Sequence, residues 1–209
     1  SSVAAVGLAN QAFFLLILIL FGISTGSAIF TAQYWGQKDV ASIRRVLGIC
    51  LTLATGAAAV FTLIAQSFPA QFLGVYSKDA EVIRLGSNYL RIVSASYIVT
   101  AVTNSFASIL RSTEEVRLPM FVSAASILLK TSLGYLLIFG RLGFPEMGIE
   151  GGAVSTVVAR FFECAALIAM AYRRKTAAAA SLNELNGFKG GLLRRYLRTV
   201  LPVAFNEFM

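Results

Sequence analysis

Three ionisable side chains lie inside long apolar stretches, and they are the first candidates for a functional role. Lys130 is the only charged residue of the run 118–140, and Arg160 and Glu163 lie within a second run, 147–172. A lysine at the centre of a bilayer costs roughly 2.5 to 3.5 kcal/mol on insertion scales, and such residues usually face a cavity where ions or substrates bind. These residues therefore predict a polar site at mid-depth in a membrane.

Signals for enzyme chemistry are missing from the sequence. The chain has no histidine, and its two cysteines, Cys50 and Cys164, lack the spacing of metal ligands. It also contains no phosphate-binding loop and no dinucleotide-binding fingerprint. We therefore expect no enzyme activity, no cofactor and no metal site, and no ATP hydrolysis by these residues.

Long apolar segments position the ionisable residues. The chain is 57% hydrophobic and 13% charged, whereas soluble domains are about 25% charged. A helix needs about 20 apolar residues to cross a bilayer. Such segments lie at about 12–34, 46–68, 89–110, 118–140 and 147–172, and a sixth begins at Val200. We predict an all-α, polytopic bundle of transmembrane helices, and a chain that is part of a longer protein.

Basic residues predict the orientation of the bundle. Lysine and arginine gather in cytoplasmic loops, and most of the 18 basic residues lie in 35–45, 111–117 and 173–199. The first span therefore runs from outside to inside. Cytoplasmic loops facing lipid headgroups explain the formal net charge of +8 better than nucleic-acid binding does, so no nucleic-acid partner is expected.

Polar residues follow one face of three of these segments. They recur at three- and four-residue steps, so each set shares a helix face. Small and hydroxyl residues on such a face favour helix packing, whereas charged residues favour a cavity. The sets are Tyr97, Thr100, Asn104, Ser108 and Arg111; Ser123, Ser126, Lys130 and Gly134; and Gly152, Thr156, Arg160 and Glu163.

Lys130 requires a polar partner at its own depth. A hairpin that turns at 144–145 brings 158–163 to that depth, which makes Glu163 the nearest carboxylate. Arg160 is one turn from Glu163 and competes for it, so two cations share one anion. We infer a missing acid, supplied by another segment or by a substrate. The alternative is a static Lys130–Glu163 pair that braces the two helices.

Five blocks of the sequence resemble, in order, the multidrug and toxic compound extrusion (MATE) transporters. The blocks are "SVAAVGLANQ", "GISTGSAIFTAQYWGQKD", "ILRSTEEVRLPM", "LGYLLIFGRLGFPEMGIEGGAVST" and "RRYLRTVLPVAFNEFM". Members of this family have twelve helices in two lobes. The resemblance implies that 1–172 form helices two to six of the N-lobe, 173–199 the basic cytoplasmic connector and 200–209 the start of helix seven. Helix one and nearly all of the C-lobe would lie outside this chain.

The resemblance implies a secondary active transporter in the plasma membrane of a prokaryote. It would perform multidrug efflux, exporting organic cations or other amphipathic, drug-like compounds by antiport with protons or sodium ions through alternating access of the two lobes. Two alternatives remain. One is a related flippase of lipid-linked oligosaccharides or precursors, which buried cations such as Lys130 and Arg160 would suit. The other is a membrane scaffold without transport.

The proton-coupled branch of this family uses an aspartate on helix one, an asparagine and an acidic residue on helix five, and a threonine on helix six. By resemblance, Lys130 stands at the asparagine position, Gly134 at the acidic position and Thr156 at the threonine position. Because the first two depart from the family, we hypothesise that Lys130 pairs with the helix-one aspartate until substrate or a proton breaks the pair.

The remaining candidates have more limited roles. Glu207 lies at the start of helix seven, whose lobe carries the cation site in the sodium-coupled branch. Gln33 and Gly36 are expected to shape the cytoplasmic end of the first span. Gly22 and Gly26 form a GxxxG pair, which is typical of a packing groove.

Overall fold

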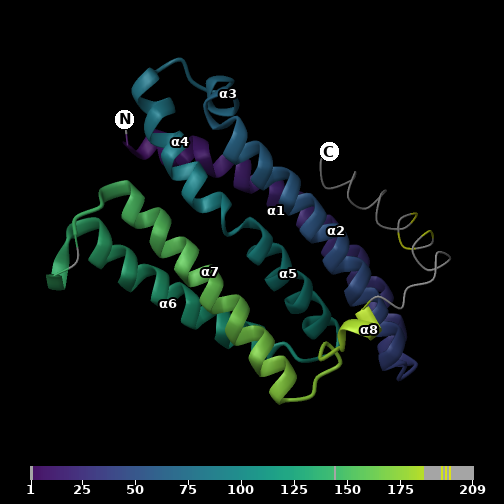
Figure 1. Ribbon diagram of the computed structural model, residues 1–209. Helices are drawn as coiled ribbons and strands as arrows, with labels where there is room; N and C mark the ends of the chain where they lie inside the picture. Colours follow the sequence, from purple (N-terminus) through teal and green to yellow (C-terminus); the bar gives the residue numbers. More distant parts are fainter. Residues whose placement is uncertain (1, 144, 186–193, 195, 197, 199–209) are drawn as a thin grey trace.

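The computed structural model describes residues 2–143, 145–185, 194, 196 and 198, which form helices and no strand (Figure 1). The prediction of an all-α membrane bundle is confirmed. The elements are α1 (Ser2–Gly36), α2 (Val40–Ser67), α3 (Pro69–Gly74), α4 (Ala80–Ser94), α5 (Tyr97–Ser112), α6 (Arg117–Phe139), the 3₁₀ turn η1 (Arg141–Gly143), α7 (Gly148–Arg173) and α8 (Leu182–Leu185).

The described helices provide up to five membrane spans. Helices α1, α2, α6 and α7 are each long and apolar enough to cross a membrane, and α4 and α5 together make a fifth span that bends by 48°. The sequence predicted one continuous helix over 89–110. The structure corrects this, because α4 begins well before Tyr89 and the span breaks after Ser94.

Side chains of α2 stabilise the break between α4 and α5. The Gln66 amide donates to the Arg91 carbonyl (2.8 Å) and to Ser94 Oγ (2.9 Å). The Thr62 hydroxyl donates to the Ala58 carbonyl of its own helix (2.8 Å) and, at the longer distance of 3.3 Å, to the Ser94 carbonyl. Carbonyl groups freed at a helix break inside a bilayer need such donors. Since no proline or glycine lies at 94–97, the local sequence contains no signal for the bend.

The α4–α5 span lies between the α1–α2 pair and the α6–α7 hairpin (Figure 1). The N-terminus, α3 and η1 lie toward one end of the bundle, which we call the outer end from the predicted orientation; α8 lies toward the opposite, inner end. Among the described helices, α6 packs mainly against α7, and its other face has few contacts with them. The core includes the fully buried Leu16, Leu20, Leu47, Tyr97, Ile109 and Leu167.

The segment after α7 is fastened to the inner end of α2. Glu184 accepts hydrogen bonds from the Ser181 backbone N–H (2.7 Å) and hydroxyl (2.9 Å), and pairs with Arg44 at 2.6 Å. The Ser181 N–H and then Arg44 lower the pKa of Glu184 to about 2. The division into lobe, connector and second lobe remains a prediction, and the span expected from Val200 onward lies outside the described residues.

Candidate functional site

The buried carboxylate of Glu163 joins α6 to α7. Only 8% of its side-chain surface is exposed. Ser123 Oγ of α6 donates to Glu163 Oε1 at 2.6 Å, and Arg160 Nη1 of α7 donates to Oε2 at 3.2 Å. The Arg160 guanidinium also lies over the Phe13 ring of α1, 5.7 Å from its centroid. Both oxygens of this carboxylate therefore have partners other than Lys130.

Two contacts on either side of Lys130 fix the register of the α6–α7 hairpin. Toward the inner end, Ser126 Oγ donates to the Ala159 carbonyl at 2.9 Å. Toward the outer end, a Cβ added to Gly134 would lie 3.2 Å from Ser155 Oγ. Lys130 is therefore level with the turn of α7 between Ser155 and Ala159.

The static pair between Lys130 and Glu163, the alternative considered from the sequence, is not formed. Glu163 lies a turn further toward the inner end than the part of α7 level with Lys130. Arg160 is on the same helix, three residues from Glu163, and forms an ion pair with its carboxylate. The other ion pair between described residues joins Arg44 to Glu184. Lys130 thus has no acidic partner in the part of the chain that the structure describes.

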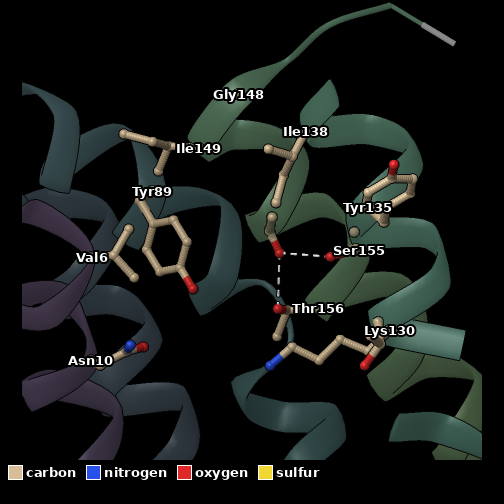
Figure 2. A pocket seen from close by; sticks show the side chains of 13 residues that line it. Val6, Asn10, Tyr89, Lys130, Tyr135, Ile138, Gly148, Ile149, Ser155 and Thr156 are labelled. Carbon is tan, nitrogen blue, oxygen red and sulfur yellow. Dashed lines mark hydrogen bonds between the residues drawn. The ribbon is translucent and has the colours of Figure 1, made fainter. Parts of the chain in front are cut away.

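A pocket of about 650 Å³ lies at the end of the Lys130 side chain (Figure 2). Its lining comes from α1, α4, α6 and α7. We call it the Lys130 pocket. Its walls include apolar Val6, Ile138 and Ile149, the rings of Tyr89 and Tyr135, and polar Asn10, Lys130, Thr131, Ser155 and Thr156.

Lys130 carries the one charge among the described lining residues of this pocket. Figure 2 shows its amine reaching from α6 toward Thr156, with Tyr89 and Asn10 on the opposite side. The hydroxyls of Ser155 and Thr156 both donate to the Gly152 carbonyl, each at 2.9 Å (Figure 2). Their hydrogen atoms are therefore engaged within α7, whereas the ammonium keeps its donors for a ligand.

Four of the residues singled out from the sequence meet in this pocket: Lys130, Gly134, Gly152 and Thr156. Arg160 and Glu163 lie further inward on α7. Their pairing in the structure matches the competition for Glu163 that the sequence predicts.

The polar face of α5 contributes to packing instead of to the Lys130 pocket. Tyr97 is fully buried, its ring centroid is 5.7 Å from that of Phe13, and its hydroxyl has no partner among the described residues. Ser108 Oγ donates to the Ser24 carbonyl of α1 at 3.0 Å. Asn104 is half-buried. Neither Tyr97 nor Asn104 lines the Lys130 pocket.

The other candidates lie away from the pocket. Gly22 and Gly26 are buried in α1, as a packing role requires. Gln33 is exposed near the inner end of α1, and Gly36 is the last residue of that helix. Glu207 lies outside the described residues.

The pocket residues that sequence reasoning missed include Asn10 of α1, Tyr89 of α4 and Tyr135 of α6. Asn10 and Gln11 are adjacent amides in an otherwise apolar stretch, which is a usable but weak signal. Tyr89 was not singled out, because it was the first residue of the predicted segment 89–110, whereas α4 begins at Ala80.

Comparisons with known proteins identify the class and then the family. The long apolar helices define a multi-pass helical membrane protein, and the relatives place it in the bacterial plasma membrane. The MatE family model matches residues 1–136, and the chain belongs to this family.

Named relatives and solved structures agree with this assignment. The chain is 31% identical to the probable multidrug resistance protein YoeA of Bacillus subtilis over 83% of this chain and 37% of that protein. It is 26% identical to the probable multidrug resistance protein NorM of Thermotoga maritima, over 83% and 38%. The chain spans less than half the length of these relatives.

The similarity to solved structures supports the fold. A crystal structure of MATE in the bent conformation has a TM-score of 0.87 at 22% identity, covering 99% of this chain and 45% of that one. A MOP superfamily transporter from Pyrococcus furiosus, described as having a binding pocket of reverse polarity that suggests a different function, has a TM-score of 0.84 at 22% identity, covering 98% and 44%.

Proposed function

We propose that this chain is the N-lobe part of a secondary active multidrug exporter. The full-length protein moves amphipathic, drug-like compounds out of the cell in exchange for protons or sodium ions, by alternating access of two lobes. The observation that carries this proposal is the Lys130 pocket, which extends from the outer end of the bundle to the middle of α6 in a chain of the MatE family.

The dimensions and lining of the pocket support transport of small molecules. Its volume of about 650 Å³ is within the range of roughly 300 to 1,000 Å³ typical of small-molecule sites, which are mostly apolar with a few polar groups. A lysine retained at this depth is costly, which disfavours a scaffold without transport. Multidrug resistance is in the names of the relatives described above, so they favour the exporter over the flippase.

The residues divide into binding and positioning roles. Lys130 contacts the substrate, and Gly134 and Thr156 form the wall on either side of it. The Arg160–Glu163 pair holds α7 against α6 and so positions that wall. Coupling to protons or sodium ions needs an acidic group, and no described lining residue supplies one. The helix-one aspartate that we hypothesised as a partner of Lys130, and the C-lobe residue Glu207, remain the candidates.

The test uses the full-length protein in everted membrane vesicles. Uptake of a fluorescent organic cation and a fluorescent organic anion is followed under an imposed proton gradient and, separately, a sodium gradient. Accumulation of either probe that depends on one gradient is expected and would identify the coupling ion. Folded protein that accumulates no probe under either gradient would contradict the proposed function.

A further inference from the structure

The positive charge of Lys130 is uncompensated within the described part of its pocket. The buried carboxylate of α7, Glu163, is held by Arg160. The carboxylate in the first turn of α7, Glu150, accepts a hydrogen bond from Asn88 (3.3 Å) and does not line the pocket. A cation at a largely apolar pocket without a carboxylate favours a ligand of opposite charge, because a ligand that covers the ammonium must replace its water with a partner.

Arg160 strengthens this preference. Arg160 follows Ala159 on α7, at the inner edge of the turn that is level with Lys130, and 33% of its side-chain surface remains exposed. Glu163 neutralises only one of these two cations, so one positive charge in this layer of the bundle is left uncompensated. An organic cation entering here would meet repulsion from Lys130 and would find no carboxylate among the described lining residues.

The Lys130 ammonium is the group that favours a ligand with a hydrogen-bond acceptor. Ser155 and Thr156 donate their hydroxyl hydrogens to the Gly152 carbonyl, so they have no donor left for an anionic group. The Lys130 ammonium has three N–H donors and no acceptor. A carboxylate or sulfonate oxygen is therefore the group that this ammonium binds best, with a charge-assisted hydrogen bond.

The remaining walls define the body of the ligand. Val6, Ile138 and Ile149 present apolar surface, and the rings of Tyr89 and Tyr135 flank the space above the amine (Figure 2). Aromatic rings pack favourably on such side chains in offset or edge-to-face arrangements. The space suits an amphipathic molecule with one aromatic group and one charged end.

We propose that the Lys130 pocket binds amphipathic aromatic monoanions, with the anionic group on the Lys130 amine and the aromatic body between Tyr89 and Tyr135. This inference rests on the proposed exporter function and changes its substrate class from organic cations to organic anions. One uncompensated positive charge matches one carboxylate. A phosphate monoester, with a charge of about −1.5 to −2, exceeds what this layer neutralises.

Binding is measured with the purified full-length protein in lipid nanodiscs, with empty nanodiscs as background. Three probes share one fluorescent body: dansylglycine, its neutral amide, and a dansyl derivative that ends in trimethylammonium. The variants are Lys130→Gln, which removes the charge, and Lys130→Arg, which keeps it. Lys78→Gln is the matched control, because it removes one positive charge from the exposed loop before α4.

We expect wild-type protein to bind dansylglycine more tightly than the other two probes. Lys130→Gln should weaken dansylglycine binding by about tenfold or more, the effect of losing a hydrogen bond between charged groups. Lys130→Arg and Lys78→Gln should stay within about threefold of wild type. Preference for the trimethylammonium probe, or unchanged dansylglycine binding in folded Lys130→Gln, would overturn the inference.

The vesicle assay separates failure of this inference from failure of the proposed function. Gradient-driven uptake of the trimethylammonium probe without dansylglycine binding would leave an exporter and reject the anion. Lys130-dependent binding of dansylglycine without any gradient-driven uptake would support the ligand class and reject the exporter. Binding of none of the three probes by folded protein would also overturn the inference.

Discussion

At the scale of single residues, the two mid-depth cations of this chain have different environments. Arg160 pairs with Glu163 and lies over Phe13, so its charge is compensated where it lies. Lys130 extends into a pocket and pairs with no described acid. The first arrangement holds helices together, whereas the second leaves a charge available for a ligand.

Because Glu163 is paired and Lys130 is not, substituting them should affect the stability of the protein differently. Glu163→Gln removes a buried charge that binds Arg160 and Ser123, so it should lower the free energy of unfolding of the full-length protein by about 1.5 to 3 kcal/mol. Lys130→Gln should leave that free energy unchanged or raise it, because it removes a cation that has no described acidic partner and lies among mostly apolar walls. Thermal unfolding followed by size-exclusion chromatography measures both.

Comparing Lys130→Gln with Glu163→Gln also tests whether Lys130 pairs with an acidic residue outside the described part of the chain in the full-length protein. Equal destabilisation by Lys130→Gln and Glu163→Gln would show a carboxylate on Lys130 in the resting state, as the helix-one aspartate hypothesis requires. That result would contradict the account of Lys130 as an uncompensated cation.

The sequence predicted the important charges but not all of their partners. Lys130, Arg160 and Glu163 are recognisable because charges are rare in such apolar runs. The partner of Glu163 was predictable in part, since Arg160 is one turn away on the same helix. The absence of a Lys130–Glu163 pair depends on the hairpin register, which Ser126 and Ser155 fix through tertiary contacts that periodicity does not encode.

At the scale of elements, the α6–α7 hairpin determines the shape of the pocket. Gly151 of α7 lies directly against α6: a Cβ there would be 2.8 Å from both the carbonyl carbon and oxygen of Leu137. The neighbouring Gly152 faces more space, with the nearest atom, Ile138 Cδ1, at 3.6 Å. The two glycines therefore differ in whether a methyl group fits.

Substitution of these glycines tests the close approach of α6 and α7. Gly151→Ala should destabilise the full-length protein by about 1 to 3 kcal/mol, because backbone atoms must move apart to admit the methyl group. Gly152→Ala should be neutral or slightly stabilising, since alanine costs less than glycine inside a helix. The measurement is the same thermal unfolding assay, and equal effects of the two substitutions would rule out the hairpin packing described here.

The elements were more predictable than their interruptions. Apolar length located α1, α2, α6 and α7, because a bilayer span demands it. The break between α4 and α5 was missed, because it depends on Gln66 and Thr62 of another helix rather than on a local proline or glycine. Tyr89 was missed as a pocket residue for the same reason.

At the scale of the whole molecule, the described helices are proposed to form one lobe that works against another. The Lys130 pocket lies between α1 and the α6–α7 hairpin, and α6 is covered by α7 on one face only. In an alternating-access cycle, a pocket at this depth is reached by water from the outer side in one state and from the inner side in the other. Lipid-facing positions on the same helix are reached from neither side.

Cysteine accessibility measures this property directly. Thr131, which lines the pocket, is replaced by cysteine in full-length protein in which Cys50, Cys164 and any other native cysteines have been replaced. The control is Leu128→Cys, one turn away on α6, where the side chain is largely exposed and does not line the pocket. The reagent is the membrane-impermeant, anionic sulfonatoethyl methanethiosulfonate, applied to whole cells and to everted vesicles.

We expect Thr131→Cys to react with the reagent from both sides of the membrane. The imposed ion gradient should change the ratio of the two reaction rates, and dansylglycine should lower both rates. Leu128→Cys should react slowly from either side. Reaction of Thr131→Cys from one side only under every gradient, or at the rate of Leu128→Cys, would contradict the assignment of the Lys130 pocket as the transport cavity.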